Sequence, residues 1–229
     1  MAEVGDIEVI VFDVLGTLVD EPGGLRAAIR EAVPASDDAT VDELLTAWQQ
    51  HVELEQQRIG QGHRRYVNSE VIDAEAAQRV TDRAGIADPA TVARLATAGQ
   101  RLPPWDDSVA GLERIAQRFP VLGLSNASRT ALLRLSAHAG LRWHQAVSGD
   151  AALAYKPAPE VYQLAIDTAA SPPARVLMVA AHAWDLRGAQ MCGMQTAYVQ
   201  RPVGDPPTSA DAFDWRLNGL DELVTALTR

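Results

Sequence analysis

The sequence is poor in several features that mark particular classes of protein. Cys192 is its only cysteine, so no disulfide can form within the chain. The most apolar later run, Val176 to Ala181, is far too short to cross a bilayer. No cluster of basic residues alternates with aromatic ones, and the formal net charge is −10, so we expect no nucleic-acid partner and no membrane partner. The N-terminal sequence passes Glu3 and Asp6 without a basic segment or a long apolar run, which favours a cytoplasmic location.

Lysine is also nearly absent, because Lys156 is the single lysine among 20 lysine and arginine residues. An ammonium is a compact charge whose pKa can shift, whereas a guanidinium is planar, forked and always charged. A site that needs an ammonium therefore cannot accept arginine. This contrast makes Lys156 a candidate functional residue, with a surface lysine that persists by chance as the alternative.

The length and composition are those of an ordinary globular protein, with 229 residues of which 47% are apolar and 22% charged. Apolar residues recur at helical spacing through residues 21–102, whereas strand and helix patterns alternate from residue 103 onward. Alternation of this kind predicts an α/β fold with a Rossmann-like, doubly wound parallel sheet. We predict a core domain made of residues 1–20 and 103–229, interrupted by a helical cap domain of residues 21–102. The predicted strands lie near residues 9–13, 121–124, 146–147, 175–180 and 196–199, the last being the final strand.

The first predicted strand ends in a carboxylate that is followed by a sharp turn. Asp13 comes directly after four apolar residues, and Gly16 and Thr17 then change the direction of the chain. Ligands of parallel sheets bind just beyond the carboxyl ends of the strands, so Asp13 is placed where a nucleophile is presented. The structural alternative is an ordinary turn in which Asp13 acts only as a cap.

Polar side chains also follow three later predicted strands or their loops. They are Ser125 and Asn126, then Lys156, then His182, Trp184 and Asp185. All carboxyl ends of a parallel sheet lie at one edge, so these residues are expected to converge with Asp13. Each has a structural alternative, such as a helix cap for Ser125 or a core position for Trp184. Their joint occurrence in this order favours a site.

Taken together, these segments resemble the haloacid dehalogenase superfamily over essentially the whole length, and within it the type II L-2-haloacid dehalogenases. The motifs stand here as Phe12-Asp13-Val14-Leu15-Gly16-Thr17, Leu124-Ser125-Asn126-Ala127-Ser128, Tyr155-Lys156-Pro157-Ala158-Pro159-Glu160-Val161-Tyr162 and Ala180-Ala181-His182-Ala183-Trp184-Asp185-Leu186. The resemblance implies a Rossmann-like core with a helical cap, in agreement with the predicted insertion. It also implies a small 2-haloacid as the substrate and no cofactor.

The resemblance assigns a role to each candidate residue. Asp13 would displace halide from the α-carbon and form an ester that water hydrolyses. Thr17 would orient Asp13, Lys156 would favour its ionised form, and Asp185 would help to activate the water. The substrate-binding residues would be Leu15, Ser125, Asn126, Tyr162, His182 and Trp184. In this set Ser125 and the amides of the Leu15 and Asn126 turns would hold the substrate carboxylate. Asn126 and Trp184 would help to receive the halide, while Tyr162 would support Lys156.

Several positions depart from the family pattern. Tyrosine is usual at the position of Leu15, and serine and asparagine are often found at those of Ala180 and His182. The cap arginine that commonly receives the halide follows a tryptophan, but here Trp48 is followed by Gln49. Cap residues that could replace this arginine are Arg58, Arg64, Arg65 and His63, among which the sequence does not choose.

Two other functions remain open on the same fold. A magnesium-dependent phosphatase, or a phosphonate hydrolase, would act on a small phosphorylated metabolite. Such phosphatases normally use a second aspartate to protonate the leaving group, and Leu15 stands at that position. Asp13, the Leu15 carbonyl and Asp185 could still ligate Mg²⁺, although we expect no metal. A catalytically silent binding protein is the other alternative, and relatives often form dimers, so a homodimer is also considered.

Overall fold

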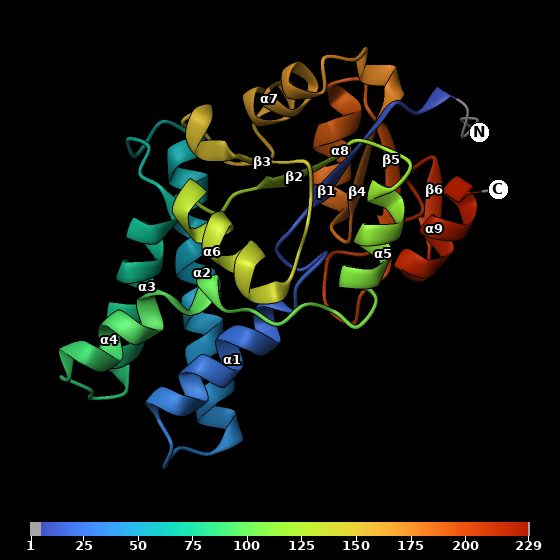
Figure 1. Cartoon of the computed structure of the whole chain (residues 1–229). Helices are drawn as coiled ribbons and strands as arrows, with labels where there is room; N and C mark the ends of the chain where they lie inside the picture. The colour runs from blue at the N-terminus through green and yellow to red at the C-terminus, as the bar shows by residue number, and fades with distance from the viewer. Residues whose placement is uncertain (1–5, 229) are drawn as a thin grey trace.

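The computed structural model describes residues 6–228, and its centre is a six-stranded parallel sheet. The strands are β1 (Val9–Asp13), β2 (Val121–Ser125), β3 (Gln145–Ser148), β4 (Val176–Ala180), β5 (Gln195–Val199) and β6 (Trp215–Leu217). Their order across the sheet is β3-β2-β1-β4-β5-β6, so the chain winds outward from β1 in both directions. This is the predicted α/β, Rossmann-like fold, and it places β1 in the middle of the sheet (Figure 1).

Side chains of β1 alternate between the two faces of the sheet, as the two-residue period of a strand requires. Ile10 and Phe12 belong to one apolar cluster, whereas Val9 and Val11 belong to a second cluster on the opposite face. All five residues of β1 are buried, because helices cover both faces. A carboxylate at the end of such a strand can only be accommodated if nearby groups bind it.

Helices from different parts of the chain cover the two faces. One face packs against apolar residues of α5 (Ser108–Ala116), α6 (Arg129–Ala139) and α9 (Leu220–Thr228), and the other against α7 (Pro159–Ala169) and α8 (Ala183–Met191). The α6 helix begins where the Ser128 hydroxyl accepts a hydrogen bond from Ala131 N, and it ends at Gly140, whose φ of 71° is left-handed. Ser128, rather than Ser125 or Asn126, is therefore the side-chain cap of this helix.

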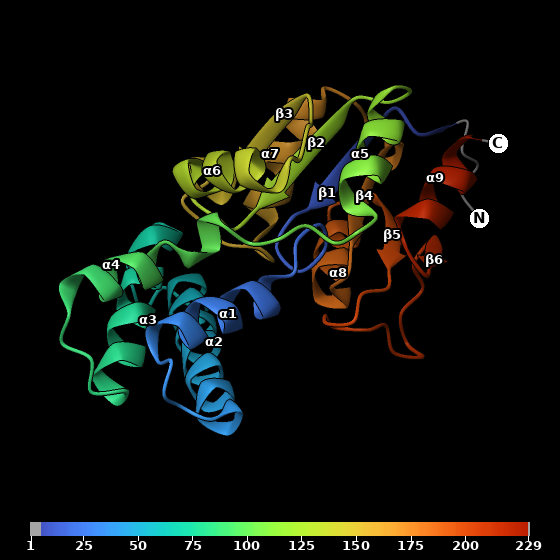
Figure 2. The same ribbon diagram turned by 60° about the horizontal axis from the view of Figure 1, so that its bottom comes forward.

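Four helices follow β1 and lie together at one end of the sheet: α1 (Glu21–Ala32), α2 (Asp38–Gly60), α3 (Ser69–Arg83) and α4 (Pro89–Ala96) (Figure 2). A capping side chain begins each of them, supplied by Asp20, Asp37, Asn68 and Asp88 in turn. We refer to residues 21–102 as the cap; the domain boundaries at 20/21 and 102/103 remain a prediction. Helices thus occupy most of residues 21–102, where the apolar spacing predicts them.

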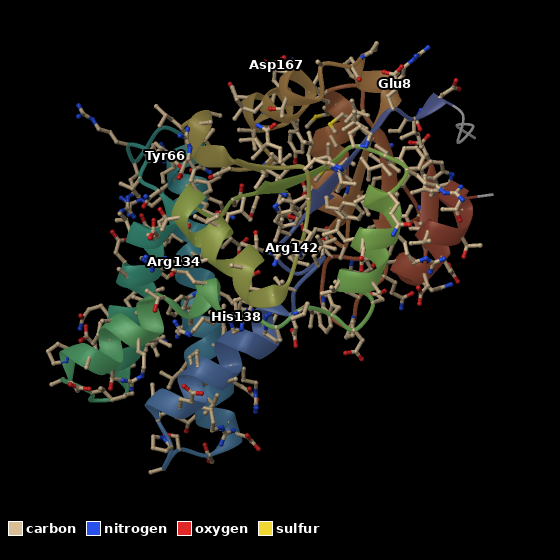
Figure 3. The ribbon with its side chains drawn as sticks, in the orientation of Figure 1. Glu8, Tyr66, Arg134, His138, Arg142 and Asp167 are labelled. Atoms are coloured by element: carbon tan, nitrogen blue, oxygen red, sulfur yellow. The ribbon has the colours of Figure 1, made fainter. Side chains whose placement is uncertain are left out.

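Polar contacts join the cap to the sheet domain close to the carboxyl end of β2. Ser128 N donates to the Ser69 hydroxyl at 2.8 Å, and the Ser128 hydroxyl donates to Glu70 at 2.8 Å. Arg134, on α6, donates to the Gln100 side chain in the short 3₁₀ turn η2 (Ala98–Gln100). Tyr66, labelled with Arg134 in Figure 3, donates its hydroxyl proton to an Asp150 carboxylate oxygen. The cap is thus held over the edge of the sheet where the candidate residues end their strands.

One strand was not predicted. The last predicted strand is residues 196–199, but β6 adds three residues that pair in parallel with β5 through Tyr198 and Arg216, among others. No β6 residue is fully buried. The β6 segment therefore needs no run of apolar residues, and the sequence contains no such run to indicate a strand. Within residues 6–228, none of the helices combines the length and the apolar character needed to cross a membrane.

Candidate active site

Asp13 lies at the carboxyl end of β1 with both carboxylate oxygens occupied. The Thr17 hydroxyl donates to Oδ2 at 2.6 Å and itself accepts a hydrogen bond from Ala181 N at 2.9 Å. Thr17 is fully buried and only 4% of Asp13 is exposed. Because Ala181 follows β4, the neighbouring strand, the hydroxyl of Thr17 is fixed between two strands and its proton points at Asp13. The predicted pairing of Thr17 with Asp13 is present in the structure.

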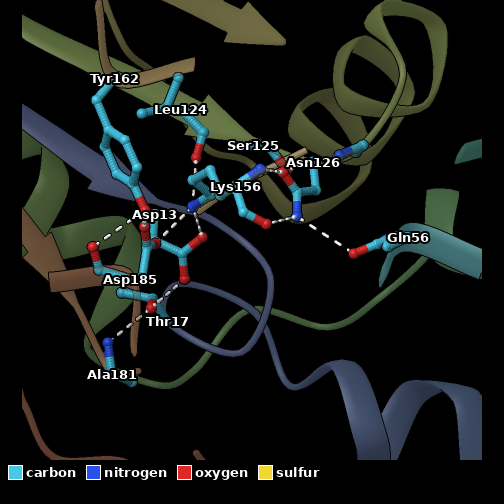
Figure 4. Close-up of polar contacts among 11 residues, drawn as sticks. Asp13, Thr17, Gln56, Leu124, Ser125, Asn126, Lys156, Tyr162, Ala181 and Asp185 are labelled. Carbon is cyan, nitrogen blue, oxygen red and sulfur yellow. Dashed lines mark hydrogen bonds and ion pairs between the residues drawn. The ribbon is translucent and has the colours of Figure 1, made fainter. Parts of the chain in front are cut away.

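The Lys156 ammonium lies between two carboxylates. Its Nζ is 2.6 Å from Asp13 Oδ1 and 2.6 Å from Asp185 Oδ2, and it also donates to the Leu124 carbonyl at 3.3 Å (Figure 4). Only 2% of the Lys156 side chain is exposed. The three protons of the ammonium therefore have three acceptors, which leaves the group satisfied and held in place.

Charge balance determines how these buried groups titrate. Burial lowers the pKa of Lys156, but the charges and hydrogen bonds of Asp13 and Asp185 outweigh burial and raise it above its ordinary value. Burial raises the pKa of Asp185, and the Lys156 ammonium opposes that rise. One ammonium is thus shared by two carboxyl groups, and its raised pKa keeps Lys156 charged at neutral pH.

Tyr162 acts on Asp185 rather than directly on Lys156. Its hydroxyl donates to Asp185 Oδ1 at 2.7 Å and lies 3.1 Å from the Asp185 carbonyl. Burial and the Asp185 charge raise the pKa of Tyr162, so the phenol keeps its proton. The expected support of Lys156 by Tyr162 therefore passes through Asp185.

Ser125 and Asn126 follow β2 at the same edge. Ser125 is fully buried, and its hydroxyl oxygen accepts a hydrogen bond from Ala127 N at 3.1 Å. Asn126 Oδ1 accepts a hydrogen bond from Lys156 N at 2.8 Å, which connects the β2 loop to the Lys156 loop. The hydroxyl proton of Ser125 has no acceptor among the hydrogen bonds of residues 6–228.

His182, Trp184 and Leu15 border this cluster on the β1 and β4 loops. The rings of His182 and Trp184 are tilted against each other, with centroids 5.8 Å apart, and Lys156 Nζ is 6.0 Å from the Trp184 centroid. His182 also lies against Gly16, where a Cβ would be only 2.5 Å from the imidazole Nε2 and φ is +77°. Glycine is thus required at this turn on two grounds. Leu15 is partly buried and presents no proton donor.

The cap arginines named as replacements do not line the Asp13 cluster. Arg64 binds Glu55 at 2.6 Å and Glu75 at 2.6 Å, and Arg58 binds Glu55 at 3.1 Å. These ion pairs lie in a separate cavity of about 340 Å³ between α2 and α3. Arg65, His63 and Gln49 are exposed. A different cap side chain, Gln56, contacts the β2 loop of the cluster, and its Oε1 is 3.4 Å from Asn126 Nδ2. Gln56 could not be predicted from the sequence, because helical spacing does not reveal which turn of α2 faces the sheet domain.

Two cap carboxyls near the site were also missed. Burial, followed by the charge of Asp13, raises the pKa of Glu21 to about 7, although His182 opposes the rise. Burial, followed by the charges of Glu21 and Glu70, raises the pKa of Asp73 to about 8. Neither carboxyl has a counter-ion among the ion pairs of residues 6–228. Glu21 begins α1 and Asp73 lies on α3, so two helices bring acidic groups toward the same region.

These two carboxyls predict a measurable dependence of stability on pH. The folded state holds protons that the unfolded chain releases near the ordinary pKa values of 4.5 and 3.8, so stability falls as pH rises toward about 8. Since the side chains are partly exposed, we expect the double variant Glu21→Gln, Asp73→Asn to be more stable than the parent by about 1–2 kcal/mol at pH 9, against no gain at pH 4. Urea unfolding at the two pH values measures this. The exposed Glu43→Gln on α2 is the control, and a parent-like pH slope in the double variant would contradict the assignment.

Comparison with known proteins agrees with this geometry. A family model described as haloacid dehalogenase-like hydrolase matches residues 7–193. The chain therefore belongs to the haloacid dehalogenase-like hydrolases, as the motifs implied. The (S)-2-haloacid dehalogenase H-109 of Pseudomonas putida is 31% identical over 227 residues, which cover 93% of this chain and 99% of that protein.

The chain is also similar to solved structures of L-2-haloacid dehalogenases. The crystal structure of the L-2-haloacid dehalogenase PA0810 has a TM-score of 0.88 at 28% identity, covering 97% of this chain and 99% of that one. The L-2-haloacid dehalogenase from Xanthobacter autotrophicus, with chloropropionic acid covalently bound, has a TM-score of 0.83 at 26% identity, covering 97% and 98%. Both similarities span the sheet domain and the cap.

Proposed function

We propose that this chain hydrolyses the carbon–halogen bond of short 2-haloalkanoic acids through an ester on Asp13, without a metal ion. The observation that carries the proposal is the Asp13 carboxylate, which is held at a strand end by Thr17 and Lys156 with no proton donor at Leu15. Relatives named (S)-2-haloacid dehalogenases, and the relative with chloropropionic acid covalently bound, support the substrate class and the covalent route.

In the first step, one carboxylate oxygen of Asp13 attacks the α-carbon of the substrate. The new carbon–oxygen bond forms as the carbon–halogen bond breaks, and the halide leaves with the bonding electron pair. No proton is transferred in this step, so it does not require a proton donor at the position of Leu15. Thr17 and Lys156 orient the attacking carboxylate before the substrate arrives, which lowers the entropic part of the barrier.

In the second step, water attacks the carboxyl carbon of the Asp13 ester. The bond between that carbon and the alkoxy oxygen breaks, the 2-hydroxy acid departs, and one water oxygen remains in Asp13. Asp185 is the base that we assign to this water, because burial raises its pKa and so makes it a better proton acceptor. Ser125 and the backbone amides beside Leu15 and Asn126 bind the substrate carboxylate, while Trp184 and His182 border the substrate.

The position of the ammonium also bears on the metal-dependent alternative. A divalent ion shared by Asp13 and Asp185 would need the space between them, where Lys156 Nζ lies 2.6 Å from each. Two cations at that spacing would repel each other strongly in a buried site. The donor set therefore suits an ammonium better than Mg²⁺.

The proposal is tested by measuring halide release from chloroacetate, bromoacetate, fluoroacetate and each 2-chloropropionate enantiomer, with EDTA present. We expect halide and the corresponding 2-hydroxy acid in equal amounts, with (S)-2-chloropropionate among the substrates. Turnover of phosphate esters that requires Mg²⁺ would contradict the proposal and favour a phosphatase. If neither halide release nor phosphate-ester turnover is detected, the result would favour the silent binding protein.

A further inference from the structure

The carbonyl groups of Gly16 and Thr17 are held by side chains from two other parts of the chain. Trp105 Nε1 donates to the Gly16 carbonyl at 3.1 Å, and Arg201 Nε donates to the Thr17 carbonyl at 2.8 Å. Among the hydrogen bonds of residues 6–228, each carbonyl accepts only this one. Gly16 has no side chain and a left-handed φ of 77°, so the turn after β1 depends on these outside donors for its position.

Arg201 is itself fixed in place. Its Nη1 lies 2.7 Å from Asp107 Oδ1, only 6% of its side chain is exposed, and its Cζ lies 5.9 Å from the centroid of the Trp105 ring. Asp107 Oδ2 accepts a hydrogen bond from Leu220 N at 2.9 Å, which anchors this carboxylate to the start of α9. Arg201, Trp105 and Asp107, which we call the brace, therefore join the turn to the sheet domain.

Stability alone does not account for the brace. Burial lowers the pKa of the Arg201 guanidinium, although Asp107 opposes the change, so the buried charge is held against a desolvation cost. The Nη2 group of Arg201 is also buried and makes no hydrogen bond within residues 6–228. An unpaired buried donor is destabilising, and a buried ion pair often contributes no net stability. What the guanidinium supplies is a donor at a fixed place, opposite the Thr17 carbonyl.

Thr17 connects the brace to the nucleophile. Its hydroxyl donates to Asp13 Oδ2 at 2.6 Å and accepts a hydrogen bond from Ala181 N at 2.9 Å, as Figure 4 shows. Arg201 binds the carbonyl of the same residue. A shift of the Thr17 backbone would therefore move its hydroxyl, and with it the Asp13 carboxylate. A displacement of about 1 Å at a reacting group can lower a rate about 10²-fold.

We propose that Arg201 and Trp105 are positioning residues that set the direction in which Asp13 attacks the substrate. The inference rests on the proposed function, and it adds residues that bind backbone carbonyl groups of the nucleophile loop rather than the reacting atoms. The brace thus acts on the rate of the chemical step and not on the affinity for the substrate. No covalent bond and no proton of Arg201 or Trp105 changes during the reaction.

Arg201→Met tests the proposal, because it keeps an apolar stem and removes the donor to Thr17. We expect kcat for chloroacetate to fall about 10²-fold with KM within about threefold of the parent, since only the attacking group is displaced. The rate constant of halide release in a single turnover at saturating enzyme should fall equally. This constant does not depend on the fraction of enzyme that is unfolded, so a merely structural role would leave it unchanged. Arg118→Met is the matched control and should keep the parent rate constant, because Arg118 also donates to a distant backbone carbonyl, that of Thr228 at 3.1 Å.

A second variant tests the other donor of the brace. Trp105→Phe keeps an aromatic ring and removes the N–H group that binds Gly16, so the single-turnover rate constant should fall about tenfold. Trp215→Phe, on β6, is the control and should behave as the parent. Unchanged single-turnover rate constants in both Arg201→Met and Trp105→Phe would overturn the proposal. A raised KM with unchanged kcat would overturn it too, because the brace would then act on substrate binding.

The position of the turn can also be measured without turnover. In NMR spectra, Arg201→Met should shift the backbone amide signal of Thr17 and the carboxyl ¹³C signal of Asp13, whereas Arg118→Met should shift neither. If no haloacid is turned over but these shifts occur, the proposed function fails and the brace stands. If haloacids are turned over and Arg201→Met keeps the parent rate constant, the brace fails and the proposed function stands.

Discussion

Asp13→Asn is expected to abolish halide release from every 2-haloacid that the parent converts, with a loss of at least about 10⁴-fold in kcat. An amide oxygen is a poor nucleophile and would leave the substrate without an attacking group. Asparagine can still accept the Thr17 hydrogen bond, so the loop should keep its shape. Ion chromatography of released halide measures the effect, and circular dichroism checks that the variant is folded.

The prediction distinguishes a carboxylate that takes part in the reaction from one that only orients water. If Asp13 only oriented a water molecule, the asparagine variant would keep part of its activity, because an amide can also hydrogen-bond to water. Residual turnover within about 100-fold of the parent would therefore contradict a nucleophilic role. Asp106→Asn, on the connector between cap and sheet domain, is a control and should behave as the parent.

Lys156→Arg is expected to be nearly inactive, with a loss of at least about 10³-fold in kcat, although the positive charge is kept. The ammonium donates to Asp13, Asp185 and the Leu124 carbonyl from one tetrahedral nitrogen. A guanidinium is larger and planar, and the buried space between the two carboxylates is closed to it. It would displace the Asp13 carboxylate from the position set by Thr17. Halide release again measures the effect.

Lys156→Met separates charge from shape. This variant leaves two buried carboxylates without a counter-ion, so we expect it to be destabilised by about 3–5 kcal/mol as well as inactive. Lys156→Arg should be the more stable of the two in urea unfolding. Full turnover by the arginine variant would show that charge alone is sufficient and that the single lysine of this chain has no special role.

Much of the sheet domain could be predicted because its signals are local. Buried parallel strands such as β1 and β4 are continuous apolar runs, and parallel strands end at one edge, so Asp13 and Asp185 were placed together. The short strand β6 could not be predicted, since it is partly exposed and pairs with a single neighbour. Strand position alone therefore explains most of the candidate site.

The contribution of the cap could not be predicted in the same way. Helical spacing identifies the apolar side of α2, but the rotation of the cap over the sheet domain depends on contacts such as Ser128 with Ser69. That docking decides that Gln56 faces Asn126, and that Arg58 and Arg64 bind glutamates elsewhere. The raised pKa values of Glu21 and Asp73 likewise depend on burial between elements of the fold, which the sequence alone does not show.

Isotope labelling tests the ester on Asp13 most directly. A single turnover of excess enzyme on (S)-2-chloropropionate in H₂¹⁸O, followed by mass spectrometry of the peptide that contains Asp13, reports where the water oxygen goes. We predict that one ¹⁸O atom enters the Asp13 carboxylate and that the 2-hydroxy acid of this first turnover carries none. Label in the hydroxyl group of the product, with none in Asp13, would contradict the account.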